Sequence, residues 1–273
     1  MYTVSHFLWL VICASLIVGT LIWLNKNKPS LKSVFSIACI GCIISEFIKV
    51  FSALALVPSA DGTQMRVYIE TGYVPLHLCS IQIIFIFFCR FAKESKAKET
   101  LLAFMYPTCT LGAFFALMIP TLFDSQTTLV DAFARSHPYE YFLYHAMLVI
   151  LGLYIPMSKQ VDIKAKNYFT SVGILGVLAF LSLYLNSIFA TPIYQNGELK
   201  SVEYTTNFFF TYETPIGIEF TEIWQWYVYL VVILLLALVL IGIFYIPYFI
   251  KAKREKEEGK MNEKEREMAK ISS

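Results

Sequence analysis

Four side chains that could do chemistry lie inside apolar stretches of this chain: Glu46, His77, Cys79 and His145. Ionisable groups are expensive inside a membrane, so they usually line an interior cavity, pair with one another or carry function. A thiol becomes a nucleophile only as the thiolate, which needs a neighbouring imidazole or positive charge. These residue types therefore indicate a polar site inside the membrane, provided that the helices bring them to a similar depth.

The chain has the composition of an integral membrane protein. Hydrophobic residues make up 57% of the 273, and the charged 15% are concentrated between long apolar runs. A spanning helix needs about 20 apolar residues, and the alternating segments that mark a membrane barrel do not occur in the sequence. We predict an all-α, seven-helix transmembrane domain over 1–250. Its spans are expected at about 5–24, 34–57, 73–91, 101–123, 138–157, 168–190 and 222–250.

The basic residues predict the orientation of this bundle. Eighteen of the 22 Lys and Arg residues follow odd-numbered spans, whereas the opposite intervals hold only Arg66, Arg135 and Lys200. The positive-inside rule then places the N-terminus outside and the C-terminus in the cytoplasm. The first span is expected to be a retained helix, because no Lys or Arg precedes it and its apolar run is longer than a signal-peptide core. A composition rich in Lys, Ile and Phe favours a bacterial cytoplasmic membrane.

Two segments differ from the short links between spans. The outer interval 191–221 is long and rich in aromatic residues, which is typical of a lid or a binding element. The tail 251–273 mixes Lys and Arg with Glu, as a solvated or surface-lying cytoplasmic helix does. We expect the tail to contact anionic lipid rather than to take part in chemistry.

Counting along the spans brings polar residues to the outer half of the bundle. At 1.5 Å per residue, Cys79 lies about 9 Å and His145 about 10 Å below the outer ends of their spans. Span two brings Glu46 and Lys49 to the middle and outer half, and span six brings Asn186 near its outer end. We therefore expect a common site at this level.

The residue types leave several kinds of site open. Glu46 and Lys49 are three residues apart on one helix face, which predicts an ion pair, although Glu46 could also orient a histidine. On a helix, His77 and Cys79 point in nearly opposite directions, so His145 is the natural base unless span three begins irregularly. Packing roles for the thiol and the histidines stay open. A metal site built from the same side chains is a further alternative, although the sequence has no paired metal-binding motif to support it.

The segment Val74–Ser80, VPLHLCS, resembles the LPLHLC segment of the YwaF-like/TMEM164 family of seven-helix membrane proteins. The resemblance covers about 70–270 and extends loosely to His145 and to the Asn207-Phe208 pair before the last helix. It implies cysteine-dependent acyl transfer on phospholipids, with Cys79 as nucleophile and His145 as base.

Two segments, 191–206 and Thr211–Pro215, depart from the family pattern. They leave open a changed substrate head group or the lack of a lipid activity.

Together with the resemblance, the residues predict an integral membrane acyltransferase or lipid acyl hydrolase. Cys79 would form a thioester with an acyl chain of a membrane phospholipid and pass it to a lysolipid or to water. We expect no cofactor, no resident metal and no nucleic-acid partner. The residues expected to support catalysis, line the substrate or donate to an oxyanion are His77, Gln82, Glu46, Lys49, Asn186 and Asn207. The alternative is a transporter or a seven-helix ligand-binding sensor that uses the same outer cavity.

Overall fold

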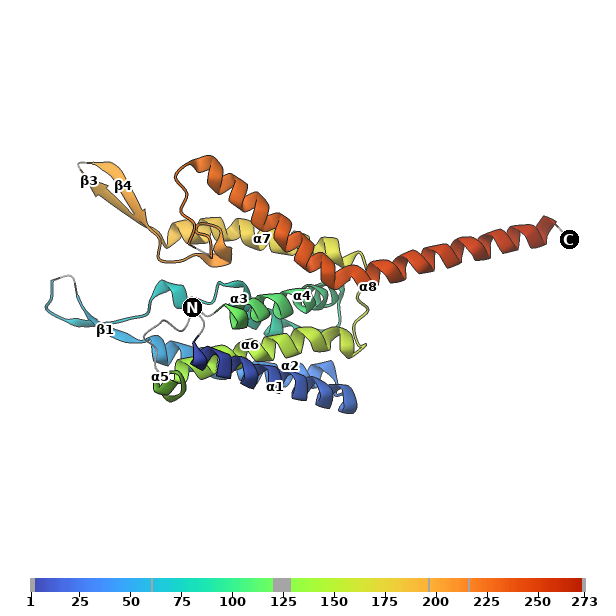
Figure 1. The fold of residues 1–273 in the computed structure, drawn as a ribbon, viewed down its shortest axis with the longest axis horizontal. Helices are drawn as coiled ribbons and strands as arrows, with labels where there is room; N and C mark the ends of the chain where they lie inside the picture. The colour runs from blue at the N-terminus through green and yellow to red at the C-terminus, as the bar shows by residue number, and fades with distance from the viewer. Residues whose placement is uncertain (1–2, 60, 120–128, 196, 216, 272–273) are drawn as a thin grey trace.

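The computed structural model is a bundle of long helices with two small β-hairpins at one end (Figure 1). It describes residues 3–59, 61–119, 129–195, 197–215 and 217–271. The α-helices of this part are α1 (Val4–Asn27), α2 (Leu31–Ala53), α3 (Leu78–Phe91), α4 (Lys96–Met118), α5 (Leu129–Ala134), α6 (Ser136–Met157), α7 (Asn167–Ile188) and α8 (Ile223–Ile271). The other elements are the 3₁₀ helices η1 (Thr71–Tyr73) and η2 (Phe208–Phe210), the hairpin of β1 (Ala55–Pro58) with β2 (Met65–Tyr68), and the hairpin of β3 (Thr191–Gln195) with β4 (Glu198–Glu203).

Seven helical segments of the described chain are long and apolar enough to cross a membrane, which confirms the predicted all-α, seven-helix class. The N-terminus and both hairpins lie at one end of the bundle, whereas the C-terminus lies beyond the other end (Figure 1). We call the end with the N-terminus the outer end, following the orientation predicted from the basic residues.

α4 and α6 form the centre of the bundle. α6 packs against α1, α2 and α4, and α4 also contacts α3, α7 and α8. In their apolar stretches 56% of α4 and 61% of α6 is buried, compared with 11% of α7 and of α8. The peripheral helices therefore present their apolar side chains to the surrounding lipid.

The backbones of α4 and α6 approach closely at Gly152. A Cβ atom added there would lie 2.4 Å from Thr110 Oγ1 and 3.0 Å from the Tyr106 carbonyl oxygen. Small residues permit such close approach between membrane helices. Gly173 on α7 differs, because no described atom lies within 4 Å of an added Cβ.

We expect Gly152→Ala to destabilise the protein by about 1–3 kcal/mol, the usual cost of overpacking a tight contact. A lower midpoint of thermal unfolding in detergent would report this effect. The matched control is Gly173→Ala, which should leave the midpoint unchanged or raise it slightly, because Ala is the better helix former. Equal midpoints for the wild type and Gly152→Ala would contradict the close approach of the two helices.

The outer ends of α2 and α3 differ from the predicted spans. α2 ends at Ala53 rather than at 57, because Ala55–Pro58 pairs with Met65–Tyr68 as an antiparallel hairpin. α3 begins at Leu78, and the segment before it, predicted from 73 onward as helix, is extended at Val74 and His77. Pro75 disfavours helical geometry at the preceding residue, which explains the extended backbone of Val74.

The turn of the first hairpin is fixed by Asp61. Its carboxylate accepts hydrogen bonds from the Ser59 hydroxyl and from the backbone and hydroxyl of Thr63. These hydrogen bonds, led by the one from Ser59, lower the pKa of Asp61 to about 2, so this carboxylate is ionised at neutral pH. Gly62, with a φ of 69°, adopts the left-handed conformation that the turn requires.

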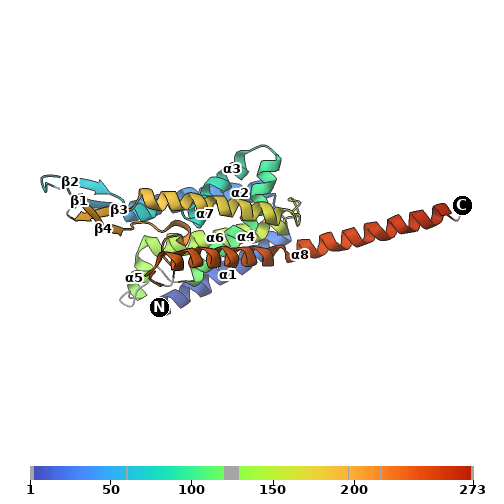
Figure 2. The ribbon, with the colours of Figure 1, turned by 90° about the horizontal axis from the view of Figure 1, so that it is seen from above.

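The predicted outer loop 191–221 contains the second hairpin, η2 and irregular backbone between α7 and α8. The strands pair in antiparallel register with an irregularity at Ile193/Tyr194. Both hairpins extend from the outer end of the bundle (Figures 1 and 2).

α8 is one helix of 49 residues. It covers the predicted seventh span and continues through most of the charged tail, far beyond the inner end of the bundle (Figure 2). Ion pairs between Lys251 and Glu255 and between Lys253 and Glu257 connect successive turns. Pairs of this kind stabilise an exposed helix by about 0.2–0.5 kcal/mol each. The predicted end of the fourth span, at 123, lies outside the described residues.

Candidate functional site

Cys79 is the second residue of α3. His77 caps this helix with extended backbone angles, φ −68° and ψ 155°. The first N–H groups of a helix have no acceptor within the helix, and the N–H groups of Cys79 and Ser80 here lie beside the Cys79 sulfur. The thiol is therefore surrounded on one side by backbone hydrogen-bond donors and by the positive end of a helix dipole.

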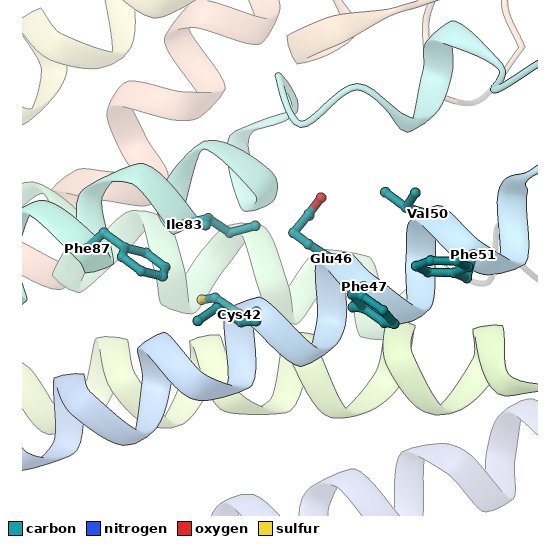
Figure 3. A pocket seen from close by; sticks show the side chains of 8 residues that line it. Cys42, Glu46, Phe47, Val50, Phe51, Ile83 and Phe87 are labelled. Atoms are coloured by element: carbon teal, nitrogen blue, oxygen red, sulfur yellow. The ribbon is translucent and has the colours of Figure 1, made fainter.

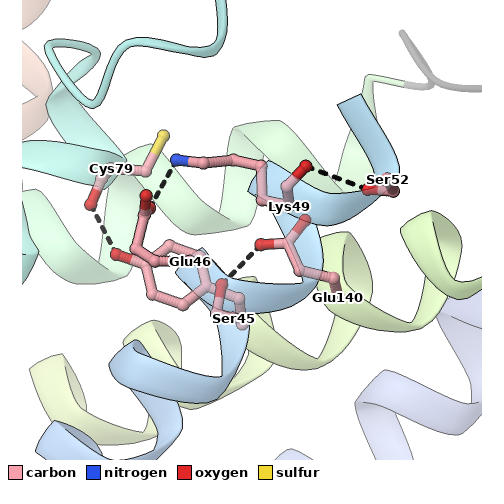
Figure 4. A network of polar contacts seen from close by, with 7 residues as sticks. Ser45, Glu46, Lys49, Ser52, Cys79 and Glu140 are labelled. Atoms are coloured by element: carbon pink, nitrogen blue, oxygen red, sulfur yellow. Dashed lines mark hydrogen bonds and ion pairs between the residues drawn. The ribbon is translucent and has the colours of Figure 1, made fainter. Parts of the chain in front are cut away.

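Glu46 and Lys49 form the ion pair that their spacing predicts. Both side chains are sheltered on α2, with 28% of Glu46 and 12% of Lys49 exposed. Figure 4 shows the Lys49 ammonium directed toward the Glu46 carboxylate and the Cys79 thiol. The pair thus places a positive charge on the α2 side of the α3 N-terminus.

Lys49 is the electrostatic centre of a larger group of side chains. Its charge interacts with a thiol, two imidazoles and a second carboxylate from α3, α6 and the segment before α3. We call this group the Lys49 cluster; its members are Glu46, Lys49, His77, Cys79, His137 and Glu140.

α6 joins the cluster through residues spaced four apart. The Tyr144 hydroxyl donates to the Cys79 carbonyl oxygen over 2.8 Å, and Glu140 accepts a hydrogen bond of 2.5 Å from the Ser45 hydroxyl. Glu140 is only 9% exposed. The sequence analysis did not include His137, Glu140 or Tyr144 in the site. Glu140 could have been found, because it is a carboxylate inside a predicted span and lies four residues before Tyr144 on the same helix face.

His145 lies on a different face of α6. Its Nδ1 atom is 2.6 Å from the Tyr141 carbonyl oxygen, and the Tyr141 hydroxyl donates to Ala116 on α4 over 2.7 Å. Gly152, two turns further along that face, packs against Thr110 of α4. In the described structure, His145 and Cys79 are not hydrogen-bonded to each other.

Gln82 links α3 to α4. Its Nε2 atom donates to Thr108 Oγ1 over 3.1 Å, and its Oε1 atom accepts from the Cys109 thiol over 3.3 Å. The residue is completely buried. Gln82 thus uses its amide to hold the two helices together below Cys79.

Asn186 and Asn207 both organise the outer loop. Fully buried Asn186 donates to the carbonyl oxygen of Phe208 and to the hydroxyl of Thr211, and it accepts from the Phe208 N–H and the Thr206 hydroxyl. The Asn207 side chain donates to the Glu213 carbonyl oxygen and accepts from the backbone N–H groups of Tyr212 and Glu213. The three predicted oxyanion donors are therefore all engaged with other groups: Gln82 with α4, and Asn186 and Asn207 with the outer loop.

The loop that Asn186 holds covers one side of the cluster. Phe208 is fully buried and its ring packs edge-on against His77, with ring centroids 4.9 Å apart. Phe209 and Phe210 follow in the left-handed region, with φ of 58° and 54°. Such angles are uncommon for bulky residues and require support from surrounding contacts.

An apolar groove of about 410 Å³ lies between α2 and α3 (Figure 3). Its walls include Cys42, Phe47 and Val50 from α2 and Ile83 and Phe87 from α3. Glu46 also lines the groove, and it is the one charged residue among the lining side chains that the structure describes. The Lys49 cluster therefore touches the groove at Glu46, and apolar side chains line the groove on both sides of this residue.

Neither a metal site nor a disulfide is formed by the described residues. They contain no group of three or more His, Cys, Asp or Glu side chains that could hold a metal ion. The six cysteines are free thiols.

The family model described as the TMEM164 family matches residues 1–245. The chain belongs to the TMEM164 family. The match covers all seven predicted spans except the last residues of the seventh, and it supports an integral, multi-pass membrane protein. No curated protein and no solved structure matches the chain.

Proposed function

We propose that this TMEM164-family protein is an integral membrane acyltransferase, or a lipid acyl hydrolase, in which Cys79 attacks an acyl ester of a membrane phospholipid. The observation that carries the proposal is the position of Cys79. The thiol lies at a helix N-terminus and beside the sheltered Lys49 ammonium, whose partner Glu46 lines an apolar groove between α2 and α3. Attack on a lipid ester requires these three features together: a nucleophile, a positive field that activates it, and a site for the acyl chain.

Lys49 and the α3 N-terminus are the groups that favour a thiolate at Cys79. A thiol in apolar surroundings is unreactive, and positive charge or a helix N-terminus is what activates it. The arrangement of Figure 4 supplies both. Glu46 holds the ammonium in place through the ion pair.

The backbone N–H groups of Cys79 and Ser80 are the proposed oxyanion donors. Donors that are already oriented toward developing charge give the largest single contribution in many acyl-transfer enzymes. This assignment replaces Gln82, whose amide joins α3 to α4. It also replaces Asn186 and Asn207, whose amides hold the outer loop.

The proton is assigned to a histidine of the Lys49 cluster. His77 is the cap residue of α3, two residues before Cys79, and His137 lies on α6, three residues before Glu140. His145, predicted as the base from its depth and from the family resemblance, bonds to Tyr141 on the face toward α4. On a regular helix the side chains of His77 and Cys79 would point in nearly opposite directions. The backbone at His77 is extended, so this restriction does not apply.

The proposed reaction has two steps. The histidine takes the thiol proton, the sulfur bonds to the ester carbon, and the carbon–oxygen bond to the leaving lysolipid breaks as the histidine returns the proton. In the second step a lysolipid hydroxyl or water attacks the thioester and gives its proton to the histidine, and the thiol is restored. The substrate arrives sideways from the outer leaflet, and we place the protein in a bacterial cytoplasmic membrane.

The test is acyl transfer by the purified protein in liposomes. Labelled phospholipid and an unlabelled lysophospholipid are supplied, and labelled products are followed by mass spectrometry. We expect His77→Gln or His137→Gln to lower the rate by at least about 10²-fold, the contribution usual for general acid–base groups, and His145→Gln to retain most of it. Loss in His145→Gln alone would return the base to His145. A folded wild type that moves no acyl group would overturn the proposal and favour the transporter or sensor.

Lys49→Met should lower the rate at which a membrane-permeant maleimide alkylates Cys79 by about tenfold or more, because removing the positive charge disfavours the thiolate. Lys49→Arg keeps the charge and is the matched control. The double variant Glu46→Gln/Lys49→Met separates this effect from the cost of leaving Glu46 unpaired. Wild-type alkylation rates in both Met variants would exclude Lys49 as the activating group.

A further inference from the structure

The apolar groove and the Lys49 cluster share Glu46. We infer that the groove between α2 and α3 binds the acyl chain of the lipid substrate, with the ester at Cys79 and the chain end toward Phe87. The inference rests on the proposed function for the location of the ester. It adds a binding site for the chain and a residue that sets its length.

The groove follows one face of each helix. Ile83 and Phe87 are four and eight residues after Cys79 on α3, so they lie below it on the same side. On α2, Cys42 lies one turn inward from Glu46. At 1.5 Å per residue, the path from Cys79 to Phe87 measures about 12 Å along the helix. Glu46 therefore lies midway along the groove: Cys42, Ile43, Ile83 and Phe87 form the inner half, and Val50 and Phe51 lie outward of it.

The inner half of the groove suits the acyl chain of a lipid. A phospholipid has its ester near the polar head group and its apolar chain toward the centre of the membrane, in the same order as Glu46 and the apolar residues inward of it. Ile43, Phe47 and Phe51 on the rim are 57%, 63% and 59% exposed on a spanning helix, so the groove opens toward lipid. Its volume of about 410 Å³ falls within the range of about 300–1,000 Å³ found for ligand sites.

Phe87 is the residue that limits the chain length. Figure 3 shows its ring at the end of the groove opposite Val50 and Phe51. A smaller side chain there lengthens the channel, so Phe87→Ala should shift the chain-length preference toward longer acyl chains. Phe88→Ala is the matched control, because Phe88 is a neighbouring residue of α3 that does not line the groove.

Binding is tested separately from catalysis. A phospholipid with a photoreactive diazirine near the end of its acyl chain is added to Cys79→Ala in liposomes. The sample is irradiated, and the labelled residues are identified by mass spectrometry. We expect labels on Ile83, Phe87 and Cys42 and their loss in Ile43→Trp, which fills the inner half of the groove. Val177→Trp, at a lipid-exposed position of α7, should leave the labelling unchanged.

The outcomes distinguish this inference from the proposed function. Labels spread evenly over the lipid-facing sides of α1, α2 and α7, insensitive to Ile43→Trp, would mean bulk lipid only and would overturn the groove as a binding site. Groove labelling without any acyl transfer by the wild type would keep the lipid site and refute the catalytic role of Cys79. Acyl transfer with an unchanged chain-length profile in Phe87→Ala would refute the length-limiting role of Phe87.

Discussion

Replacing Cys79 by alanine is expected to abolish acyl transfer, with a loss of about 10³-fold or more in rate, because removing a covalent nucleophile leaves only the contributions of binding and oxyanion donors. Folding should be nearly unchanged. The side chain is small, and the hydrogen bond from Tyr144 goes to the backbone carbonyl oxygen of residue 79, which alanine retains. The measurement is labelled product per minute in liposomes, with unfolding midpoints recorded in parallel.

Cys39→Ala is the matched control for this variant. Cys39 is a buried cysteine on α2, below the groove and outside the Lys49 cluster. It should retain wild-type activity. Equal activity of Cys79→Ala and the wild type would show that Cys79 is a packing residue and would end the acyl-transfer mechanism.

Asn186→Ala is expected to have the largest effect on stability. Asn186 is fully buried, and it satisfies both the N–H and the carbonyl oxygen of Phe208 as well as two threonine hydroxyls. Each buried polar group left without a partner costs about 1–3 kcal/mol, so the loss should reach about 2–5 kcal/mol. The loop over His77 should open first, because its contacts to α7 depend on this side chain.

Limited proteolysis and thermal unfolding both check this expectation. Cleavage between Tyr204 and Thr214 should become faster in Asn186→Ala, and the unfolding midpoint should fall. Asn27→Ala is the control, because the exposed Asn27 side chain donates to the Trp23 carbonyl oxygen one turn earlier in its own helix. Unchanged cleavage in Asn186→Ala would mean that the outer loop is held by other contacts.

The helices could be predicted from the sequence because the thickness of a bilayer sets the length of each apolar run. The Glu46–Lys49 pair could also be predicted, since residues three apart on a helix are neighbours. The outer hairpins could not, because each depends on pairing between two short exposed segments, and an isolated two-stranded hairpin is at best marginally stable. The start of α3 was predicted too early, because the apolar character of the sequence continues through Pro75 whereas the helix begins only at Leu78.

The sequence paired Cys79 with His145 by depth and by the family resemblance. Depth fixes the height of a residue but not its direction around the helix. Neighbouring residues of a helix point about 100° apart. Tyr144 therefore contacts Cys79, whereas His145 bonds to Tyr141 on the α4-facing side. The roles of Asn186 and Asn207 could not be predicted from the sequence either. Their hydrogen-bond partners lie in an irregular loop, and the conformation of that loop depends on the hydrogen bonds to these two side chains.

Direct detection of an acyl-enzyme on Cys79 tests the central claim. The wild-type protein in liposomes is incubated with phospholipid that carries a labelled acyl chain, quenched in acid and digested, and the peptide that contains Cys79 is analysed by mass spectrometry. We predict a mass increase of one labelled acyl group on Cys79, released by neutral hydroxylamine and absent in Cys79→Ala. An unmodified Cys79 peptide during active turnover, or a label of equal yield on another cysteine, would contradict the account.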